Sequence, residues 1–157
     1  MERELMKISV RELVEFILRS GDIDNRVGGK KDAESMLAGA RIHRKIQRSM
    51  GSDYHAEVTL KHLIPMEQFD LQVEGRADGI IDGNPVTIDE IKGIYKSLEY
   101  LKEPVTVHLA QAKCYAYIYG IQNEKSEMDI QMTYVNLDTE QKRYFYEHYT
   151  IDELSEW

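Results

Sequence analysis

The chain has 157 residues, of which 42% are hydrophobic and 31% charged, and its formal net charge is −8. This length suits one domain with a hydrophobic core, and no apolar run approaches the roughly 20 residues of a membrane span. The charged N-terminus lacks the apolar centre of a signal peptide. The one cysteine, Cys114, excludes an internal disulfide and a four-cysteine iron–sulfur cluster or zinc site within the chain. These features predict a cytoplasmic globular protein without a membrane partner. The acidity lowers the expectation of a nucleic-acid partner but leaves room for a local basic patch.

The predicted elements begin with two helices. Ser9 is expected to cap the first, Val10–Arg19, in which apolar residues recur at helical spacing. The second runs from Lys31 or Asp32 to about Met50. Three strands, one buried helix and two further strands then follow, at residues 55–63, 69–81, 86–94, 105–119, 128–137 and 143–150.

The order α-α-β-β-β-α-β-β predicts a mixed central sheet flanked by helices, in the α/β or α+β class. The tail from Ile151 to Trp157 looks like the first turn of another helix, with Asp152 as its cap. An unfinished helix at this end suggests that residues 1–157 form a single domain of a longer polypeptide.

A predicted hairpin between residues 74 and 93 carries the most informative pattern. Gly83-Asn84-Pro85 marks a turn between two strand-like runs. A three-residue loop at this turn would pair Ile80 with Ile88, and Asp78 with Glu90. Directly opposed residues share one face, with their Cβ atoms roughly 4.5–5.5 Å apart. This register would bring two carboxylates together.

Lys92 lies two residues beyond Glu90 and would share its face. Two adjacent carboxylates repel each other unless a cation lies between them, and Mg²⁺ prefers such oxygen ligands. A lysine beside them can hold a water or a phosphate oxygen, as phosphodiester hydrolysis requires. A four-residue loop would instead place Asp89 opposite Asp78 and turn Glu90 and Lys92 away. The hairpin would then be a surface element with solvated charges.

These residues resemble the RecB-like branch of the PD-(D/E)XK nucleases. Gly75-Arg-Ala-Asp78 is similar to the family's G-x-x-D strand, and Asp89-Glu-Ile-Lys92 to its D/E-x-K element, with Glu90 in the acidic position. Gln111-Ala-Lys-Cys-Tyr115 resembles the Q-x-x-x-Y helix motif. His43 resembles the upstream helical histidine, and Glu57 a glutamate that many members carry on the first strand.

The resemblance spans roughly residues 36–120 and implies a restriction-endonuclease-like αβββαβ core. It implies a deoxyribonuclease whose Mg²⁺ or Mn²⁺ is held by Asp78, Glu90, the carbonyl of Ile91 and His43. Lys92 would orient the attacking water, and Glu57 would support the metal site. Gln111 and Tyr115 would lie by the substrate or by Lys92.

The resemblance further implies an exonuclease that acts on DNA ends or single strands in repair or recombination. The layout is also similar to a nuclease domain fused ahead of a bacterial DinG-type helicase, which would make a covalently linked helicase domain a partner. The alternative is a non-catalytic DNA-binding or structural domain that keeps the nuclease fold.

Two further features suggest nucleic-acid contacts. Arg41, Arg44 and Arg48, with Lys45 between them, form a basic stripe on the second helix that could position a phosphate backbone. A solvated helix face is the alternative. The tyrosine-rich strand at residues 143–149 could stack bases, but we expect its aromatic side chains to pack against the sheet.

Overall fold

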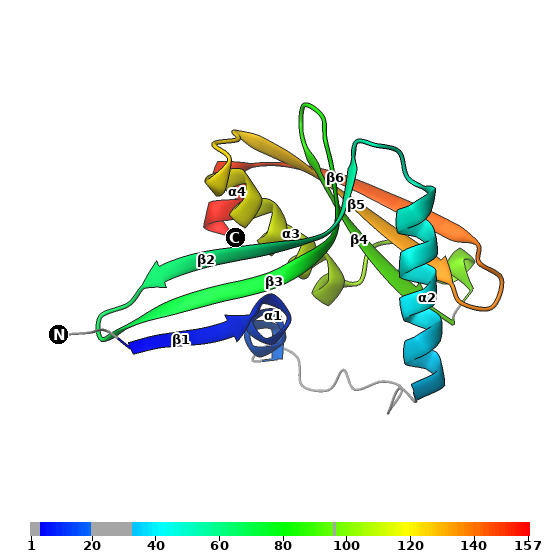
Figure 1. The fold of residues 1–157 in the computed structure, drawn as a ribbon, viewed down its shortest axis with the longest axis horizontal. Helices are drawn as coiled ribbons and strands as arrows, with labels where there is room; N and C mark the ends of the chain where they lie inside the picture. Colours follow the sequence, from blue (N-terminus) through cyan, green and yellow to red (C-terminus); the bar gives the residue numbers. More distant parts are fainter. Residues whose placement is uncertain (1–3, 20–32, 96) are drawn as a thin grey trace.

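The computed structural model describes residues 4–19, 33–95 and 97–157. Within these residues, a six-stranded mixed sheet carries helices on both faces (Figure 1). The elements in chain order are β1 (Glu4–Ser9), α1 (Val10–Arg19), α2 (Ala33–Ser49), β2 (Tyr54–Pro65), β3 (Phe69–Ile81), β4 (Thr87–Ile94), the 3-10 helix η1 (Leu98–Tyr100), α3 (Thr106–Gln122), β5 (Glu127–Asn136), β6 (Lys142–Thr150) and α4 (Ile151–Glu156). The predicted mixed α+β class is confirmed, and α2 to β5 follow the order αβββαβ.

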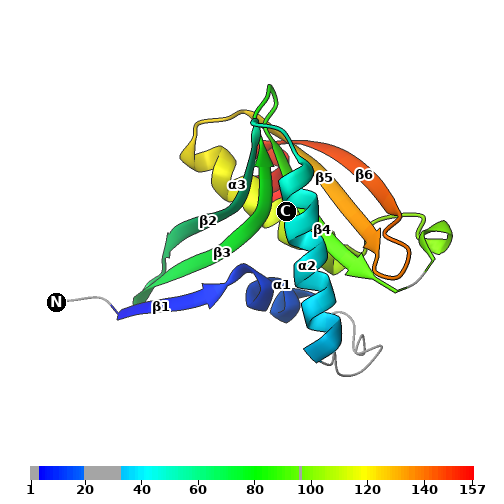
Figure 2. The ribbon, with the colours of Figure 1, turned by 45° about the vertical axis from the view of Figure 1, so that its right-hand side comes forward.

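Strand β3 organises the sheet because it pairs along both of its edges. Antiparallel β2 follows one edge over nearly its whole length. The other edge is shared, since residues 69–74 pair with parallel β1 and residues 79–81 with antiparallel β4. Strand β5 pairs with β4 in parallel, and β6 with β5 in antiparallel orientation. Strands β1 to β3 therefore form an arm that leaves the β4–β6 part of the sheet (Figure 2).

Helices α3 and α2 cover opposite faces of the β4–β5 region. Helix α3 packs against the main core, which includes Ile88 of β4 and Met132 of β5. Helix α2 packs on a smaller apolar cluster made of Ile42, Ile46, Ile91, Val135 and Leu137. In the described part of the chain, no helix combines the length and apolar character needed to cross a membrane.

The structure corrects two of the predicted features, a strand that was missed and the cap of the last helix, and confirms a third. Strand β1 was not predicted, because its short run gains its structure from parallel pairing with residues 60 or more positions away. The helix α4 is capped by Thr150, not by Asp152, since the Thr150 hydroxyl accepts a hydrogen bond from Glu153 N in a capping box. The Ser9 cap of α1 is confirmed by the 3.0 Å hydrogen bond from Glu12 N to Ser9 Oγ. The predicted start of the second helix lies outside the described residues.

Candidate active site

The β3–β4 hairpin has the register that the three-residue loop predicts. Ile80 pairs with Ile88 and Gly79 with Asp89, which excludes the four-residue alternative. The ladder ends at this second pair, so the expected pairing of Asp78 with Glu90 is not part of it. The two acids lie where β3 begins to leave β4 for β1.

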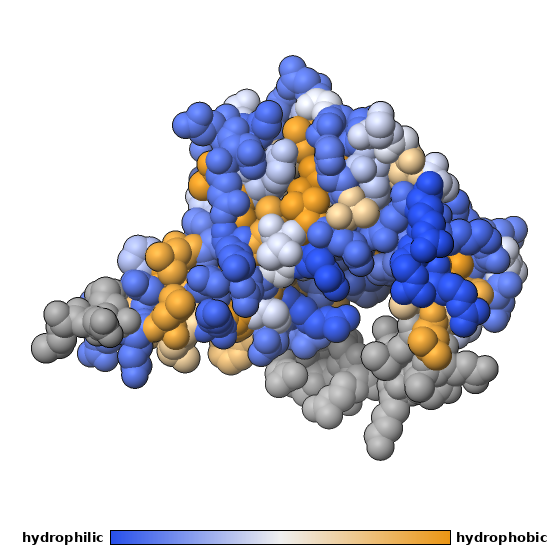
Figure 3. Space-filling view, in the orientation of Figure 1, coloured by the Kyte–Doolittle hydropathy of each residue, from blue (hydrophilic) through white to orange (hydrophobic). Residues whose placement is uncertain are grey.

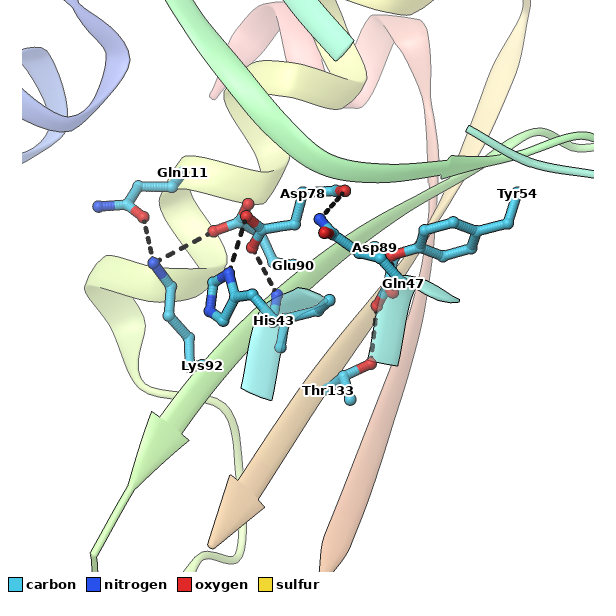
Figure 4. A network of polar contacts seen from close by, with 10 residues as sticks. His43, Gln47, Tyr54, Asp78, Asp89, Glu90, Lys92, Gln111 and Thr133 are labelled. Carbon is cyan, nitrogen blue, oxygen red and sulfur yellow. Dashed lines mark hydrogen bonds and ion pairs between the residues drawn. The ribbon is translucent and has the colours of Figure 1, made fainter. Parts of the chain in front are cut away.

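The side chains at this separation point converge from both strands (Figure 4). The carboxylate of Asp78 accepts a 2.8 Å hydrogen bond from the backbone N–H of Ile91, which links β3 to β4 beyond the end of the ladder. The side chain of Glu90 lies beside that of Asp78 (Figure 4), close enough for the charge of Asp78 to raise the pKa of Glu90. The Lys92 ammonium is 3.3 Å from a carboxylate oxygen of Glu90. The structure therefore gathers two acids and one ammonium group.

The electrostatic environment of Glu90 is unfavourable for its charged form. Only 3% of this residue is exposed. Burial, followed by the charge of Asp78, raises the pKa of Glu90 to about 8, although Lys92 opposes the rise. A buried carboxylate that is crowded by a second one is stabilised either by a proton or by an additional cation.

The donor atoms at this point suit a hard divalent cation. In a strand the N–H and C=O of one residue point to the same side, so the Ile91 carbonyl is directed toward the side on which Asp78 lies. With the two carboxylates this makes an oxygen-rich set, which Mg²⁺ accepts when water completes the shell. Among residues 4–19, 33–95 and 97–157, no three His, Cys, Asp or Glu side chains are grouped to hold a metal ion. The fit is to two carboxylates and a backbone oxygen.

Helix α2 contributes two polar side chains that contact Asp78. The Nδ1 atom of His43 lies 3.4 Å from Asp78 Oδ1. One turn later, Gln47 Nε2 donates a 2.9 Å hydrogen bond to the backbone carbonyl of Asp78. His43 was predicted as a metal ligand, and the structure places it against the carboxylate of another predicted ligand. Sequence reasoning missed Gln47, although its position four residues after His43 puts both on one helix flank.

Helix α3 supports the site from the opposite side. Gln111 Oε1 accepts a 3.0 Å hydrogen bond from Lys92 Nζ. The Tyr115 hydroxyl hydrogen-bonds to the backbone of Arg76, and it lies so close to Gly75 that a Cβ there would be 2.7 Å from the hydroxyl oxygen. Both α3 side chains are buried. Of the two predicted positions, by the substrate or by Lys92, the structure places Gln111 at Lys92, whereas Tyr115 holds β3.

The remaining predicted residues are exposed on α2 and β2. Arg41, Arg44 and Arg48 are exposed on α2, on the side away from the Ile42 and Ile46 contacts.

Glu57 is exposed, and the flanking pairs of β2 and β3 place it across from Asp78. Its backbone φ of 54° lies in the left-handed region, which is uncommon for a residue other than glycine. Such backbone conformations are concentrated at functional sites.

Asp89 is a second buried acid, and the sequence did not predict its structural role. Its carboxylate accepts hydrogen bonds from Tyr54 Oη at 2.6 Å, Thr133 Oγ1 at 2.7 Å and Gln131 Nε2 at 3.3 Å. Tyr54 reaches Asp89 by crossing Gly79, where a Cβ would lie 2.0 Å from the tyrosine oxygen. This network, the Asp89 brace, joins β2, β4 and β5 at the last pair of the β3–β4 ladder.

Comparisons with known proteins support the fold. No protein-family model matches the sequence, and no curated protein matches it. The chain is similar to the crystal structure of SSO0001 with a TM-score of 0.64 and 17% identity, over 99% of this chain and 76% of that one. A weaker similarity links it to the alkaline exonuclease LHK-Exo from Laribacter hongkongensis, with a TM-score of 0.46 and 15% identity over 96% and 82% of the two chains. The likeness to SSO0001 concerns the fold alone.

Proposed function

We propose that this chain is a metal-dependent nuclease that hydrolyses phosphodiester bonds in DNA. The observation that carries the proposal is the meeting of Asp78, Glu90 and Lys92 where β3 and β4 separate. Lys92 lies 3.3 Å from Glu90, and the pKa of Glu90 is raised by burial and by Asp78. Perturbed acids with a defined charged partner are typical of functional sites.

Asp78, Glu90 and the Ile91 carbonyl would hold Mg²⁺ or Mn²⁺, with His43 as a further candidate ligand. When bound, such a cation lowers the pKa of a water molecule and stabilises charge on the scissile phosphate. No iron–sulfur cluster is part of the proposal, because the chain has one cysteine.

The protein's own groups would position the reactants. Lys92 has three N–H donors, and its contacts with Glu90 and Gln111 fix the ammonium group at the site. In this position it would orient the attacking water and stabilise the developing negative charge. Gln47 and His43 would keep Asp78 in place through α2.

We further propose that the substrate is a DNA end or a single strand, and that the reaction is exonucleolytic. Arg41, Arg44 and Arg48 would contact phosphates without reading sequence. Glu57 would support the site from β2. A DinG-type helicase domain on the same chain would supply single strands, and this pairing stays a prediction of the sequence resemblance.

The test is digestion of labelled single- and double-stranded DNA in Mn²⁺ by the wild type and by Lys92→Ala. Lys102→Ala is the control, because Lys102 is an exposed lysine outside the site. We expect digestion by the wild type and the control and its loss in Lys92→Ala. Absence of digestion by the wild type would favour a non-catalytic DNA-binding module.

Calorimetry separates the remaining alternative, a purely structural domain. Mn²⁺ binding that Asp78→Ala abolishes is expected for the nuclease. A wild type that binds no divalent metal would instead assign the charged hairpin to structure alone.

A further inference from the structure

Strand β6 exposes one row of side chains that the candidate active site does not use. Its alternate residues Lys142, Tyr144, Tyr146 and His148 are all exposed. The fractional exposures of Tyr144 and Tyr146 are 44% and 69%. Their rings are stacked, with centroids 6.3 Å apart and planes inclined by 19°.

The expectation that the aromatic residues of this strand pack against the sheet is correct for only half of them. Phe145 and Tyr149 pack against the main core, whereas Tyr144 and Tyr146 present their rings to solvent. The pair also differs from an ordinary apolar patch, since each ring carries a hydroxyl and a flat face open to stacking.

The exposed pair lies on the face of the sheet that carries α2. Tyr144 pairs with Thr133 and Tyr146 with Gln131, and both of these β5 side chains belong to the Asp89 brace. Val135, two residues beyond Thr133, contacts α2 in the smaller cluster. The stacked tyrosines are therefore beside α2 and not on the α3 side.

Basic residues connect this pair with the active site across α2. Lys142 and Lys45 line a pocket of about 220 Å³ between α2 and the β5–β6 hairpin, although Lys45 also forms an ion pair with Glu140 of that hairpin. The outer side of α2 carries Arg41, Arg44 and Arg48, and Figure 3 shows strongly hydrophilic residues along this helix. The opposite flank of α2 contacts Asp78 through His43 and Gln47.

We propose that Tyr144 and Tyr146 stack bases of a single-stranded nucleic acid, whose backbone follows Lys142 and the outer side of α2 toward Asp78. The inference rests on the proposed nuclease function and specifies its substrate as unpaired strands. Stacking on aromatic side chains needs bases that are free of a duplex and tolerates any sequence. Aromatic residues on an open sheet face bind single-stranded RNA by the same chemistry.

The neighbouring acids offset part of the positive charge along this path, since Glu140 pairs with Lys45 and also interacts with Lys142. His148 is flanked by Glu127 and Asp129, with ring–carboxylate distances of 3.2 and 2.5 Å, so the protonated ring offsets one of these two negative charges, and the remaining charge lies beyond Tyr146 from Lys142. The cationic contribution therefore comes from Lys142 and from the arginines of α2, on the side of the tyrosine pair that leads to the active site.

The test is fluorescence anisotropy of a labelled 15-nucleotide oligo(dT) with the full chain, in EDTA so that no metal-dependent cleavage occurs. We expect the double variant Tyr144→Ala/Tyr146→Ala to bind at least about tenfold more weakly, since each stacked base contributes on this scale. Tyr146→Phe keeps the ring and should bind as the wild type does. Tyr100→Ala is the matched control, because Tyr100 is 81% exposed but lies on η1.

Several results would overturn the proposal. The first two are unchanged oligo(dT) binding by the double variant and equally weakened binding by Tyr100→Ala. The other two are a wild type that does not bind oligo(dT), and a blunt duplex whose binding is weakened equally by loss of the two tyrosines. A wild-type dimer that becomes monomeric in the double variant would assign the pair to contact between copies of the chain.

Digestion in Mn²⁺ by the same proteins separates this inference from the proposed function. Ring-dependent binding without any digestion would retain the stacking surface and reject the nuclease. Digestion of oligo(dT) that the double variant carries out as fast as the wild type would retain the nuclease and reject the stacking surface.

Discussion

Asp89 and Glu90 are consecutive buried acids on β4 with opposite surroundings. Asp89 accepts hydrogen bonds from three side chains, one on β2 and two on the adjacent strand β5. Glu90 has one ammonium partner, Lys92, and faces a second carboxylate, Asp78. Side chains of successive strand residues lie on opposite faces of the sheet. Asp89, with three hydrogen-bond donors, and Glu90, next to a second carboxylate, therefore have different environments although they are consecutive residues.

The difference distinguishes an acid that holds the fold from an acid that is available for chemistry. Burial raises the pKa of both groups. At Asp89 the donors Tyr54, Thr133 and Gln131 act against that rise, and they leave little capacity for a further ligand. At Glu90 the charge of Asp78 adds to the rise, and a cation would relieve it. We therefore expect Asp89 substitutions to affect stability and Glu90 substitutions to affect activity.

The largest expected effect is on cleavage by Glu90→Gln. The amide keeps the size of the side chain but loses the charge that would hold a divalent cation. We expect metal-dependent digestion of single-stranded DNA to fall on the order of a thousandfold, comparable with the loss of a main charge-stabilising group in an active site. Initial rates in Mn²⁺ measure this loss.

The same variant tests the other side of the comparison. In EDTA, urea unfolding of Glu90→Gln should give a free energy of unfolding equal to or above that of the wild type, because the repulsion of Asp78 is gone. A marked loss of stability would show that Glu90, like Asp89, is a structural acid, and the distinction between the two would be lost.

The second prediction concerns Asp89→Ala. Removing this carboxylate leaves the buried donors of Tyr54 and Thr133 unpaired, and each unpaired group costs about 1–3 kcal/mol. We expect the free energy of unfolding to fall by about 3 kcal/mol in urea titrations. Asp89→Asn, which retains an acceptor oxygen, should lose less. Equal stability of Asp89→Ala and the wild type would contradict the assignment of Asp89 as the structural acid.

The sequence predicted the β3–β4 register better than it predicted the network around it. The turn at residues 83–85 limited the register to two alternatives, and the three-residue loop was preferred because it places two acids and a lysine on one face; the structure has this register. The Asp89 brace depends on Tyr54 crossing β3, and no local pattern reports which side chain crosses a neighbouring strand. Strand β1 was missed for the same reason, since its partner lies about 65 residues away.

The contacts that the helices make around the site also could not be predicted from the sequence patterns. Helical spacing placed Gln111 and Tyr115 on one face of α3, but it did not show that Gln111 contacts Lys92 while Tyr115 lies over Gly75. These positions depend on how closely α3 approaches the sheet, which side-chain volumes across the core decide. The roles of these residues in catalysis stay predictions.

The third prediction uses glycines to test whether close approach maintains the Asp89 brace. In Gly79→Ala the new Cβ would lie 2.0 Å from the Tyr54 hydroxyl, so the tyrosine must move away from Asp89. We expect a loss of about 2 kcal/mol in the free energy of unfolding, through strain and an unmade hydrogen bond. Differential urea unfolding measures it.

Gly39→Ala is the matched control, because apart from its chain neighbours and the adjacent helix backbone no atom of the described residues lies within 4 Å of a Cβ at this position of α2. Gly39 is partly exposed, and alanine in a helix interior is favoured over glycine by up to about 1 kcal/mol, so this variant should be slightly more stable. If Gly79→Ala were tolerated as well as Gly39→Ala, the close approach of Tyr54 would not matter to the brace.

The smallest expected effect is a change in the pH dependence of stability, and it comes from two acids that flank a histidine at the surface. His148 lies between Asp129 and Glu127, and the hydrogen bond to Asp129, followed by the charges of both acids, raises its pKa above the ordinary value of a histidine. The folded state therefore holds this proton more tightly than the unfolded chain does. The resulting stabilisation is complete below the unfolded pKa of roughly 6.5 and is lost as the pH rises through the folded pKa.

His148→Asn should remove this part of the pH dependence, since asparagine carries no proton that titrates in the range. Thermal unfolding of both proteins between pH 5.5 and about 9 measures it, with the difference in Tm largest at the acidic end and shrinking as the histidine loses its proton. The effect should be small and should weaken in high salt, because His148 is exposed and the two acids are partly exposed. Parallel Tm curves would mean that solvent already screens these acids, so that only burial makes the crowding of Asp78 and Glu90 consequential.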